Sequence, residues 1–496
     1  MKNACILAID QGTSSTKTIV FDQQGQVLAK ATVPLKTHYL DGGFVEQQPE
    51  DIYQNVLDSV RECLDTFTST GGDLSQIKTC GISNQRETFV VWDEKGEPLY
   101  NAVVWQCKRS VDVCQRLLAI DSLQDQITAS TGLIIDPYFS GTKLIWLYEN
   151  NAKVKTAVDE GRAYFGTVDT WLLYKLTQGR KYLTDHTNAS RTLFFNLHTL
   201  QWDKELLERF GLSKLNLPEI CPSASTFGES DFAGLFATPL HIDSMIGDSH
   251  SAAFGEGCFE PGTAKATLGT GCSILMNIGQ EAKPSNYGMM TTICWSTENR
   301  VDYALEGVIV SCGATIEWLK NEMNLFGDSR QTEAMAISVP DNNGVYLIPA
   351  FSGLGAPHWD MSRKAEISGL TFDCNKNHIV RAALESIPYQ IKDVITAMEA
   401  DTGLSLHELM VNGGITSNRF VLQMIADLLG SNLVNRGQPD VSALGTAYLA
   451  GLQADLFESI EAIKKLNAQQ VNSLPPNVGT RIEQDYQGWK AAIGRN

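Results

Sequence analysis

The sequence predicts a mixed α/β protein built from two similar halves, 1–248 and 249–496. Residues 6–22 form two apolar strands around a turn rich in glycine and hydroxyl side chains, and residues 264–278 repeat that pattern about 260 positions later. Between them, strand-like runs alternate with segments of helical period, which is typical of α/β domains. A duplicated fold would present both turns to a shared cleft, although a chance recurrence of one hairpin is the alternative on these residues alone.

The first element is a hairpin that can hold a phosphate. Apolar, β-branched runs flank the turn, which predicts two strands joined tightly. Backbone N–H groups and the hydroxyls of Thr13, Ser14 and Ser15 could donate hydrogen bonds to phosphate oxygens. Asp10, at the mouth of the turn, could hold the magnesium ion that accompanies a nucleotide. The same residues also fit an ordinary hairpin without a ligand.

The next elements complete a first α/β unit. A turn over residues 22–25 leads into a third strand, so that the sheet begins with three antiparallel strands. Pro49 opens a segment, 52–64, whose apolar side chains fall on one face at helical spacing. Residues 89–92 predict a further strand that ends in the turn 93–96.

Length, charge and cysteine use restrict the function classes. The 496 residues suffice for two or three domains with full cores, and the net charge of −18 disfavours nucleic-acid and anionic-membrane partners. No membrane span or signal peptide is recognisable, so a cytoplasmic protein is expected. The eleven cysteines are scattered singly, which favours buried reduced thiols over a zinc site or disulfides.

An acidic residue stands at the predicted junction between the halves. Asp248 follows the apolar run 240–246 and precedes a segment that can begin a helix. A carboxylate in that place can cap the helix, which contributes about 1 kcal/mol. Because clefts between domains bury ligands, it can equally take the proton of a substrate hydroxyl during phosphoryl transfer. Its position alone leaves both interpretations open.

Four residues of the first half could orient a polyhydroxyl ligand. Arg86 and Glu87 offer fixed donors and acceptors, or alternatively form a surface ion pair worth under about 1 kcal/mol. Trp105 and Tyr138 could provide an apolar wall with a polar handle, or could be ordinary core aromatics.

Paired glycines in the second half suggest a place for a flat ring. Gly413 and Gly414 follow an apolar strand, and Asn418 could bond an adenine or ribose edge. A left-handed Gly-Gly turn before a helix is the alternative. The phosphate-binding loop sequence Gly-x-x-x-x-Gly-Lys-Ser/Thr does not occur, which excludes that class of nucleotide site.

Together these motifs resemble the FGGY carbohydrate kinases along nearly the whole chain. The resemblance rests on residues 10–13, 83–88, 104–107, 165–172, 187–192, 304–307 and 349–357. It implies two actin-like (RNase H-like) domains around a central cleft, and ATP- and Mg²⁺-dependent phosphorylation of a primary hydroxyl of a small polyol, glycerol or a close relative. Alternatives are a kinase of a four- or five-carbon sugar alcohol or ketose such as xylulose and, in another class, an actin-like or Hsp70-like ATPase. A homodimer or homotetramer is also expected.

The resemblance also implies roles for individual residues. Asp248 matches the catalytic base and Asp10 the magnesium ligand. The polyol-binding residues correspond to Arg86, Glu87, Trp105, Tyr138, Asp248, Ser249 and Ser273. The nucleotide contacts correspond to Thr13, Ser14, Ser15, Lys17, Thr270, Gly313, Gly413, Gly414 and Ser417.

Two residues depart from the pattern of the glycerol-specific branch of that family. Ser249 stands where an amide usually contacts the substrate, and Ser273 where an aromatic ring packs on it. Replacing a buried ring by a hydroxymethyl group removes on the order of 2 kcal/mol of apolar contact. Both changes enlarge the pocket and make it more polar, which predicts room for one or two additional hydroxylated carbons.

Overall fold

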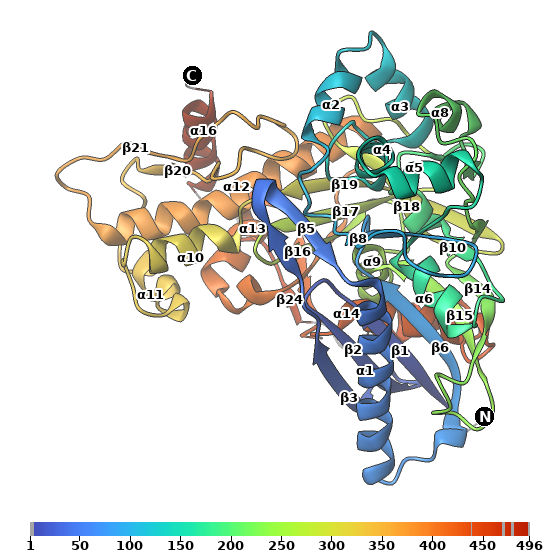
Figure 1. Cartoon of the computed structure of the whole chain (residues 1–496). Coiled ribbons are helices and arrows are strands. Elements are labelled where there is room, and N and C mark those ends of the chain that lie inside the picture. Colours follow the sequence, from blue (N-terminus) through green and yellow to red (C-terminus); the bar gives the residue numbers. More distant parts are fainter. Residues whose placement is uncertain (1–3, 438, 469–471, 478–480, 495–496) are drawn as a thin grey trace.

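Two β-sheets of the same topology organise the chain. The computed structural model describes residues 4–437, 439–468, 472–477 and 481–494 (Figure 1). The strand order is β3-β2-β1-β6-β15 in the first sheet and β19-β17-β16-β22-β23 in the second. In both, three antiparallel strands are followed by two parallel ones. This repetition confirms the predicted duplicated fold, and we call the two units the first and second lobe.

The first lobe begins with the expected meander. Its sheet contains β1 (Cys5–Gln11), β2 (Ser15–Asp22), β3 (Val27–Pro34), β6 (Ile77–Asn84), β14 (Ala224–Ser230) and β15 (Leu240–Gly247). The hairpin pairs Cys5 with Asp22 and Gln11 with Thr16, which leaves residues 12–15 as its turn. The predicted helix is α1 (Pro49–Ser69), which has Pro49 in its first turn and packs against β2 and β3.

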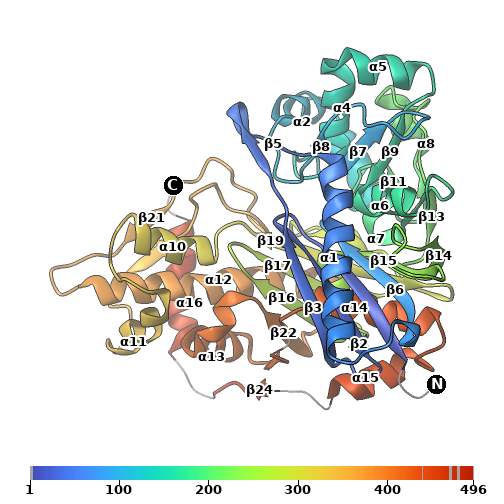
Figure 2. The same cartoon turned by 60° about the horizontal axis from the view of Figure 1, so that its bottom comes forward.

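A third sheet with its helices forms a rim on the first lobe. Its strands are β4 (His38–Leu40), β5 (Phe44–Gln47), β7 (Phe89–Trp92), β8 (Ala102–Val103) and β9 (Tyr164–Thr167). Around it lie α2 (Val111–Leu118), α3 (Leu123–Thr131), α4 (Ser140–Asn150), α5 (Ala152–Asp159), α6 (Val168–Leu176), α7 (His186–Ala189), α8 (Lys204–Arg209) and the short strands β10 (Leu183–Asp185), β11 (Phe195–Asn196), β12 (Gln201–Trp202) and β13 (Glu219–Cys221). Figure 2 shows this rim above the first sheet.

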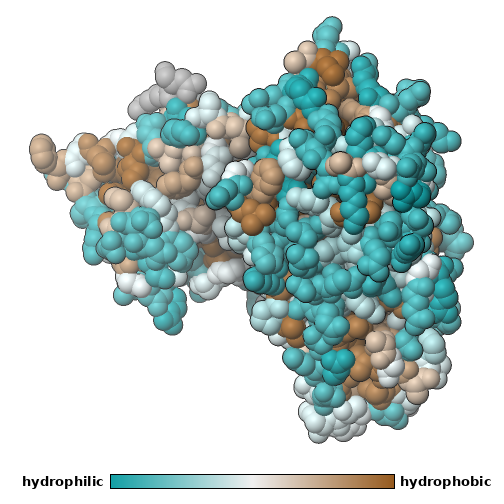
Figure 3. Space-filling model, viewed as in Figure 1, coloured by the Kyte–Doolittle hydropathy of each residue, from teal (hydrophilic) through white to brown (hydrophobic). Residues whose placement is uncertain are grey.

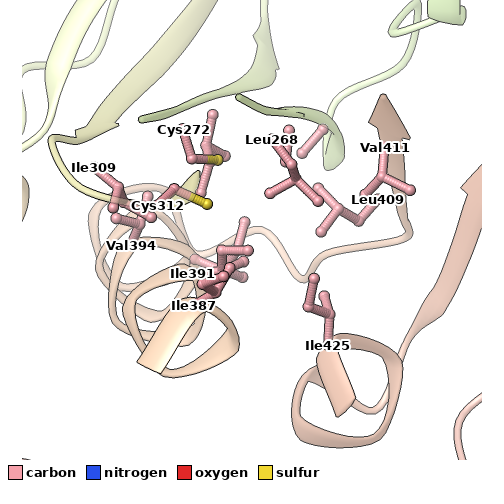
Figure 4. Packing of buried hydrophobic residues seen from close by; sticks show 14 of the residues in the cluster. Leu268, Cys272, Ile309, Cys312, Ile387, Ile391, Val394, Leu409, Val411 and Ile425 are labelled. Atoms are coloured by element: carbon pink, nitrogen blue, oxygen red, sulfur yellow. The ribbon is translucent and has the colours of Figure 1, made fainter. Parts of the chain in front are cut away.

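The second lobe repeats the hairpin. Its sheet contains β16 (Thr263–Leu268), β17 (Cys272–Gly279), β18 (Met290–Thr297), β19 (Arg300–Ile309), β22 (Glu408–Asn412), β23 (Asn432–Asn435) and β24 (Asn472–Leu474). Helices α12 (Lys376–Thr402) and α13 (Arg419–Leu429) cover one face, where Leu268 and Cys272 meet Ile387 and Ile391 (Figure 4). Helix α12 runs unbroken through Pro388.

The outer part of the second lobe carries α10 (Gly313–Asn321), α11 (Thr332–Ile337), β20 (Tyr346–Ile348), β21 (Glu366–Ser368), α16 (Ile482–Ile493) and the single turns η3 (Ser329–Gln331) and η4 (Gly414–Ser417). Helix α15 (Ile460–Ala468) lies apart from them, beside the first sheet (Figure 2), and the single turns η1 (Asp41–Gly43) and η2 (Leu74–Gln76) belong to the first lobe. The surface is deeply indented between the part that bears α10 and α11 and the rest of the molecule (Figure 3). We call this indentation the cleft.

Two helices form a layer between the two main sheets. Helices α9 (Asp248–Glu256) and α14 (Val441–Gln453) pack on each other and share one buried cluster with both sheets. Ile6 and Phe21 approach this layer from the first sheet, and Leu275 and Trp295 from the second. The lobes are therefore joined through a common core.

Most of the cysteines lie in the interior of the protein. Nine of the eleven cysteines are buried, while Cys221 and Cys374 are partly exposed. Among the described residues, no helix combines the length and apolar character that a membrane crossing needs.

Candidate active site

Asp248 lies where β15 ends and α9 begins, with its side chain partly exposed. The residue that precedes α9 in the capping position is Gly247, so the interpretation of Asp248 as the N-cap is wrong. One carboxylate oxygen, Oδ1, accepts a hydrogen bond from the N–H of Ser249 at 2.6 Å. The side chain keeps 39% of its surface exposed and is therefore accessible to a ligand.

Asp248 faces a buried arginine. The Nε atom of Arg86 lies 3.5 Å from Asp248 Oδ1. Desolvation raises the pKa of Asp248, and the positive charge of Arg86 acts against this rise. A carboxylate with a raised pKa beside a fixed cation can accept a proton from an alcohol and hold it.

Arg86 belongs to a buried cluster of alternating charges. Its Nη2 atom lies 2.8 Å from Glu306 Oε1, and Glu306 Oε2 lies 2.6 Å from Nη1 of Arg191. Arg191 in turn donates from Nε to Glu87 Oε1 at 2.6 Å. All four side chains are at most 6% exposed. Arg86 and Glu87 thus do not form the surface ion pair that was the alternative.

The cluster sets the charge of its members. The guanidinium groups of Arg191 and Arg86 hold the pKa of Glu306 far below its ordinary value despite burial. Burial raises the pKa of Glu87, which pairs with Arg191. Glu87 also adopts φ of 59°, a strained conformation for a residue with a long side chain. Such strain is typical of sites where a side chain must point in one direction.

Two aromatic rings stand beside this cluster. Trp105 and Tyr138 contact each other edge to face, with ring centroids 5.6 Å apart, and both are partly exposed. Arg86 Nη2 lies 3.4 Å from the hydroxyl of Tyr138, and the indole N–H of Trp105 donates to Thr13 Oγ1 at 2.9 Å. Trp105 therefore links the predicted polyol contacts to the first hairpin turn.

Asp10 offers a carboxylate to a cation. Ser83 donates to Asp10 Oδ1 at 2.8 Å. Desolvation and the nearby charge of Asp248 raise the pKa of Asp10 to about 6, and the charge of Lys17 acts against this rise. Magnesium prefers one or two carboxylates together with phosphate oxygens and water, so these residues fit it. Among the described residues, no group of three or more acidic, histidine or cysteine side chains forms a complete metal cage.

A cavity of about 810 Å³ opens at the second hairpin turn. Its lining includes Thr270, Gly313, Gly414 and Ser417, four of the predicted nucleotide contacts, together with Asn418. The walls come from the first turn of α10, from η3 and α11, and from η4. The volume is in the range of small-molecule sites and suits an adenosine.

Gly413 lies just behind this cavity and permits a close approach of two strands. Its φ is 99° and its ψ is 172°, which is outside the left-handed helical region, so the alternative of a left-handed turn is wrong. A Cβ atom on Gly413 would lie 2.5 Å from the carbonyl oxygen of Leu268. Only glycine fits this position without a shift of β16 or β22.

Three predicted nucleotide contacts have other neighbours in the structure. Lys17 Nζ lies 3.3 Å from Asp440 Oδ1, which precedes α14, so its charge is already paired. Ser14 and Ser15 lie in the first turn, where their carbonyl groups accept hydrogen bonds from the N–H groups of Leu35 and Gly12. Their hydroxyl groups are not part of the group around Asp248.

Reasoning from the sequence missed three charged residues of the site. Glu306 and Arg191 belong to motifs that carried the resemblance, but the sequence predicted no role for either residue. Lys265 was not predicted as a site residue. Lys265 lies fully buried in β16 and donates from Nζ to Ser249 Oγ at 2.5 Å and to Thr267 Oγ1 at 3.2 Å. A charged residue inside an otherwise apolar strand was the available signal, because a buried charge needs polar partners.

The structure combines two lobes of repeated topology, a hairpin turn in each lobe, a buried ion cluster and a nucleotide-sized cavity. This combination is typical of a class of small-molecule phosphotransferases. The FGGY family of carbohydrate kinases matches this chain with its N-terminal domain over residues 5–255 and with its C-terminal domain over residues 264–454. The chain belongs to this family.

Individual relatives cover the whole chain. It is 44% identical to a glycerol kinase of Symbiobacterium thermophilum over 100% of this chain and 99% of the relative. It is 42% identical to a glycerol kinase of Halothermothrix orenii over 99% of this chain and 98% of the relative. The crystal structure of Plasmodium falciparum glycerol kinase with ADP is similar with a TM-score of 0.93 and 33% identity, over 99% of this chain and 98% of the other. The expected two-domain kinase fold is thereby confirmed.

Proposed function

We propose that this kinase transfers the γ-phosphoryl group of ATP to a primary hydroxyl of glycerol or of a closely related small polyol. The observation that carries the proposal is the carboxylate of Asp248, which is partly exposed and lies 3.5 Å from Arg86, itself paired with Glu306. Support comes from the relatives named glycerol kinase, which are 41–44% identical over almost the full chain.

Asp248 acts as the general base in this proposal. The alcohol proton moves to a carboxylate oxygen of Asp248 while the alcohol oxygen attacks the γ-phosphorus. Arg86, Glu87 and Tyr138 orient the remaining hydroxyls, and Trp105 covers the carbon chain. Phosphoryl transfer depends mainly on positioning and on stabilisation of charge, which a rigid ion cluster supplies.

The two hairpin turns hold the nucleotide in this proposal. Thr13 and Thr270 contact its phosphates, with Ser14, Ser15, Lys17 and Gly313 nearby, while Gly413, Gly414 and Ser417 adjoin the adenosine. Asp10 would hold magnesium, which neutralises charge on the phosphate oxygens when bound. The proposed domain boundary is at residues 248/249, next to the general base. A cytoplasmic location and a homodimer or homotetramer complete the proposal.

The variant Asp248→Asn tests the role of the base. An amide keeps the shape of the side chain and cannot accept the proton, so kcat with glycerol should fall by about 10²-fold or more. Binding of ADP, measured by titration calorimetry, should change by less than about threefold. Asp58→Asn, an exposed carboxylate on α1, provides the matched control and should keep full activity. Near wild-type kcat in D248N would remove Asp248 from its role.

A further inference from the structure

Two neighbouring parallel strands of the first sheet end beside the proposed general base and its cation. Strand β15 ends at Gly247, directly before Asp248. Strand β6 ends at Asn84, two residues before Arg86. Gly247 and Asn84 are partners in the register of the two strands, and a Cβ atom on Gly247 would lie 2.8 Å from Cγ of Arg86. The separation of Asp248 and Arg86 therefore depends on how these two strand ends are held.

The short helix α7 contacts both strand ends. The N–H of Gly247 donates to Thr187 Oγ1 at 2.9 Å. The side-chain amides of Asn84 and Asn188 exchange two hydrogen bonds, of 2.9 and 3.0 Å. Thr187 and Asn188 are consecutive residues of α7, so one turn of helix connects the ends of β15 and β6.

Asp185, which precedes α7, fixes both contacts. Its Oδ2 atom accepts from Thr187 Oγ1 at 2.7 Å, and its Oδ1 atom accepts from Asn188 Nδ2 at 2.8 Å. Because the Thr187 hydroxyl accepts from Gly247, it directs its own proton to the carboxylate. The N–H groups of residues 187 and 188 and the hydroxyl of Ser223 supply further donors. Asp185, Thr187 and Asn188 are fully buried, so bulk water does not replace a lost bond.

We propose that Asp185 is a positioning residue, which acts through α7 to hold the general base at its productive distance from Arg86. This inference rests on the proposed function and adds to it a buried group behind the two strand ends. A role confined to capping α7 would need only the two backbone N–H groups. The side chains of Thr187 and Asn188 instead carry the connection onward to both strands. Since phosphoryl transfer depends steeply on alignment, a small displacement of the base lowers kcat more than it changes substrate binding.

The variant Thr187→Val tests one of the two connections. Valine keeps the branched shape and removes both hydrogen bonds of the hydroxyl. With glycerol, kcat should fall by about tenfold or more, while KM for ATP and for glycerol should each change by less than about threefold. Thr187→Ser restores the hydroxyl and should recover at least about half of the wild-type kcat. The stoichiometry of ADP binding, measured by titration calorimetry, gives the fraction of folded enzyme to which kcat is referred.

A second variant and a matched control accompany this test. Asn84→Ala removes the exchange with Asn188 and should lower kcat in the same way, which keeps the inference testable if one variant folds poorly. Thr177→Val is the control, because the buried Thr177 hydroxyl likewise donates to one group, the carbonyl oxygen of Leu173, and accepts from another, the N–H of Lys181. It should destabilise the protein to a similar extent and leave kcat unchanged.

The outcomes separate this inference from the proposed function. If D248N is inactive while T187V and N84A both keep the wild-type kcat, the positioning role is overturned and the general base stands. If T177V loses as much kcat as T187V, the loss is a general effect of a missing buried hydroxyl, and the positioning role is again overturned. If D248N itself keeps full activity, the proposed function fails and the positioning role fails with it.

Discussion

Arg191 ties together two carboxylates that come from different lobes. Glu87 follows β6 in the first lobe, and Glu306 lies in β19 of the second, yet both are within 2.6 Å of the Arg191 guanidinium. All three side chains are excluded from solvent. Burial of three charges is costly, so such a cluster is stable only while every partner is present.

Removal of Arg191 should therefore destabilise the protein strongly. In Arg191→Met, buried Glu87 loses the cation that pairs with it and Glu306 keeps Arg86 alone, so we expect a loss of about 3–5 kcal/mol in stability. Arg116→Met removes an arginine of similar size from an exposed pair with Glu149 and should cost at most about 1 kcal/mol. Calorimetric unfolding of both variants and the wild type compares them directly. Equal melting temperatures of R191M and R116M would contradict the prediction.

A second buried acid makes stability depend on pH. Asp169 in α6 accepts hydrogen bonds from Thr167 and Thr184, and burial together with the charge of Asp185 raises its pKa to about 7 from 3.8. Between about pH 4 and pH 7 the folded state keeps a proton that the unfolded chain has released. The free energy of unfolding therefore falls as pH rises through this interval.

The variant Asp169→Asn should remove this dependence. When the pH rises from 5 to 8, the free energy of unfolding of the variant should increase relative to that of the wild type by about 1–4 kcal/mol, because an amide does not titrate. Unfolding followed at both pH values measures the change. The control Asp65→Asn changes an exposed acid on α1, and its free energy of unfolding should differ from that of the wild type by the same amount at pH 5 and pH 8. A constant offset for D169N would show that Asp169 stays ionised in the folded protein.

At the scale of elements, the crossing of α9 and α14 determines where Asp248 stands. A Cβ atom on Gly445 would lie 1.8 Å from the carbonyl oxygen of Ser251, so the backbones of the two helices touch. Ser251 is on the first turn of α9, three residues after Asp248. A shift at this contact therefore moves the general base of the proposed mechanism.

Gly445→Ala should separate the two helices. The added methyl group forces a backbone movement, and we expect a loss of more than about 2 kcal/mol in stability together with a lower kcat. Gly327→Ala is the control, because a Cβ atom there meets nothing within 4 Å. Thermal unfolding and steady-state kinetics measure both effects. Full activity in G445A would show that the crossing tolerates the larger residue.

Elements with a local pattern could be predicted from the sequence, whereas contacts between distant residues could not. Both hairpins and α1 were foreseen because turn residues and apolar periodicity are local. Arg191 and Glu87 are 104 positions apart, and no local pattern links them. Lys265 was missed for the same reason, since its partner Ser249 lies on another element. The pairing of Lys17 with Asp440 likewise joins distant parts of the chain.

At the scale of the whole molecule, the cleft between the lobes couples the two proposed ligands. The nucleotide cavity belongs to the second lobe, and Arg86, Trp105 and Tyr138 belong to the first. A reaction between ligands held by different lobes proceeds only when the lobes bring them together, and this approach also excludes water.

Consumption of ATP should consequently depend on the polyol. Without a polyol, water is a poorly positioned nucleophile, and we expect addition of glycerol or its preferred relative to raise ATP turnover by about 10²-fold or more. A coupled assay of ADP release with and without each polyol measures this ratio. The D248N variant should stay slow in both conditions. Rapid hydrolysis that ignores the polyol would favour the alternative of an actin-like ATPase.

The layer of α9 and α14 has a consequence for synthesis of the chain. Strands β1 to β3 end at Pro34, but the helix that covers their inner face begins only at Val441, about 400 residues later. At ordinary rates of translation this face of the sheet stays unpacked for roughly 20–80 seconds, until α14 has been synthesised. Ile6 and Phe21 are exposed during that time, so the nascent chain should bind chaperones until its last quarter emerges.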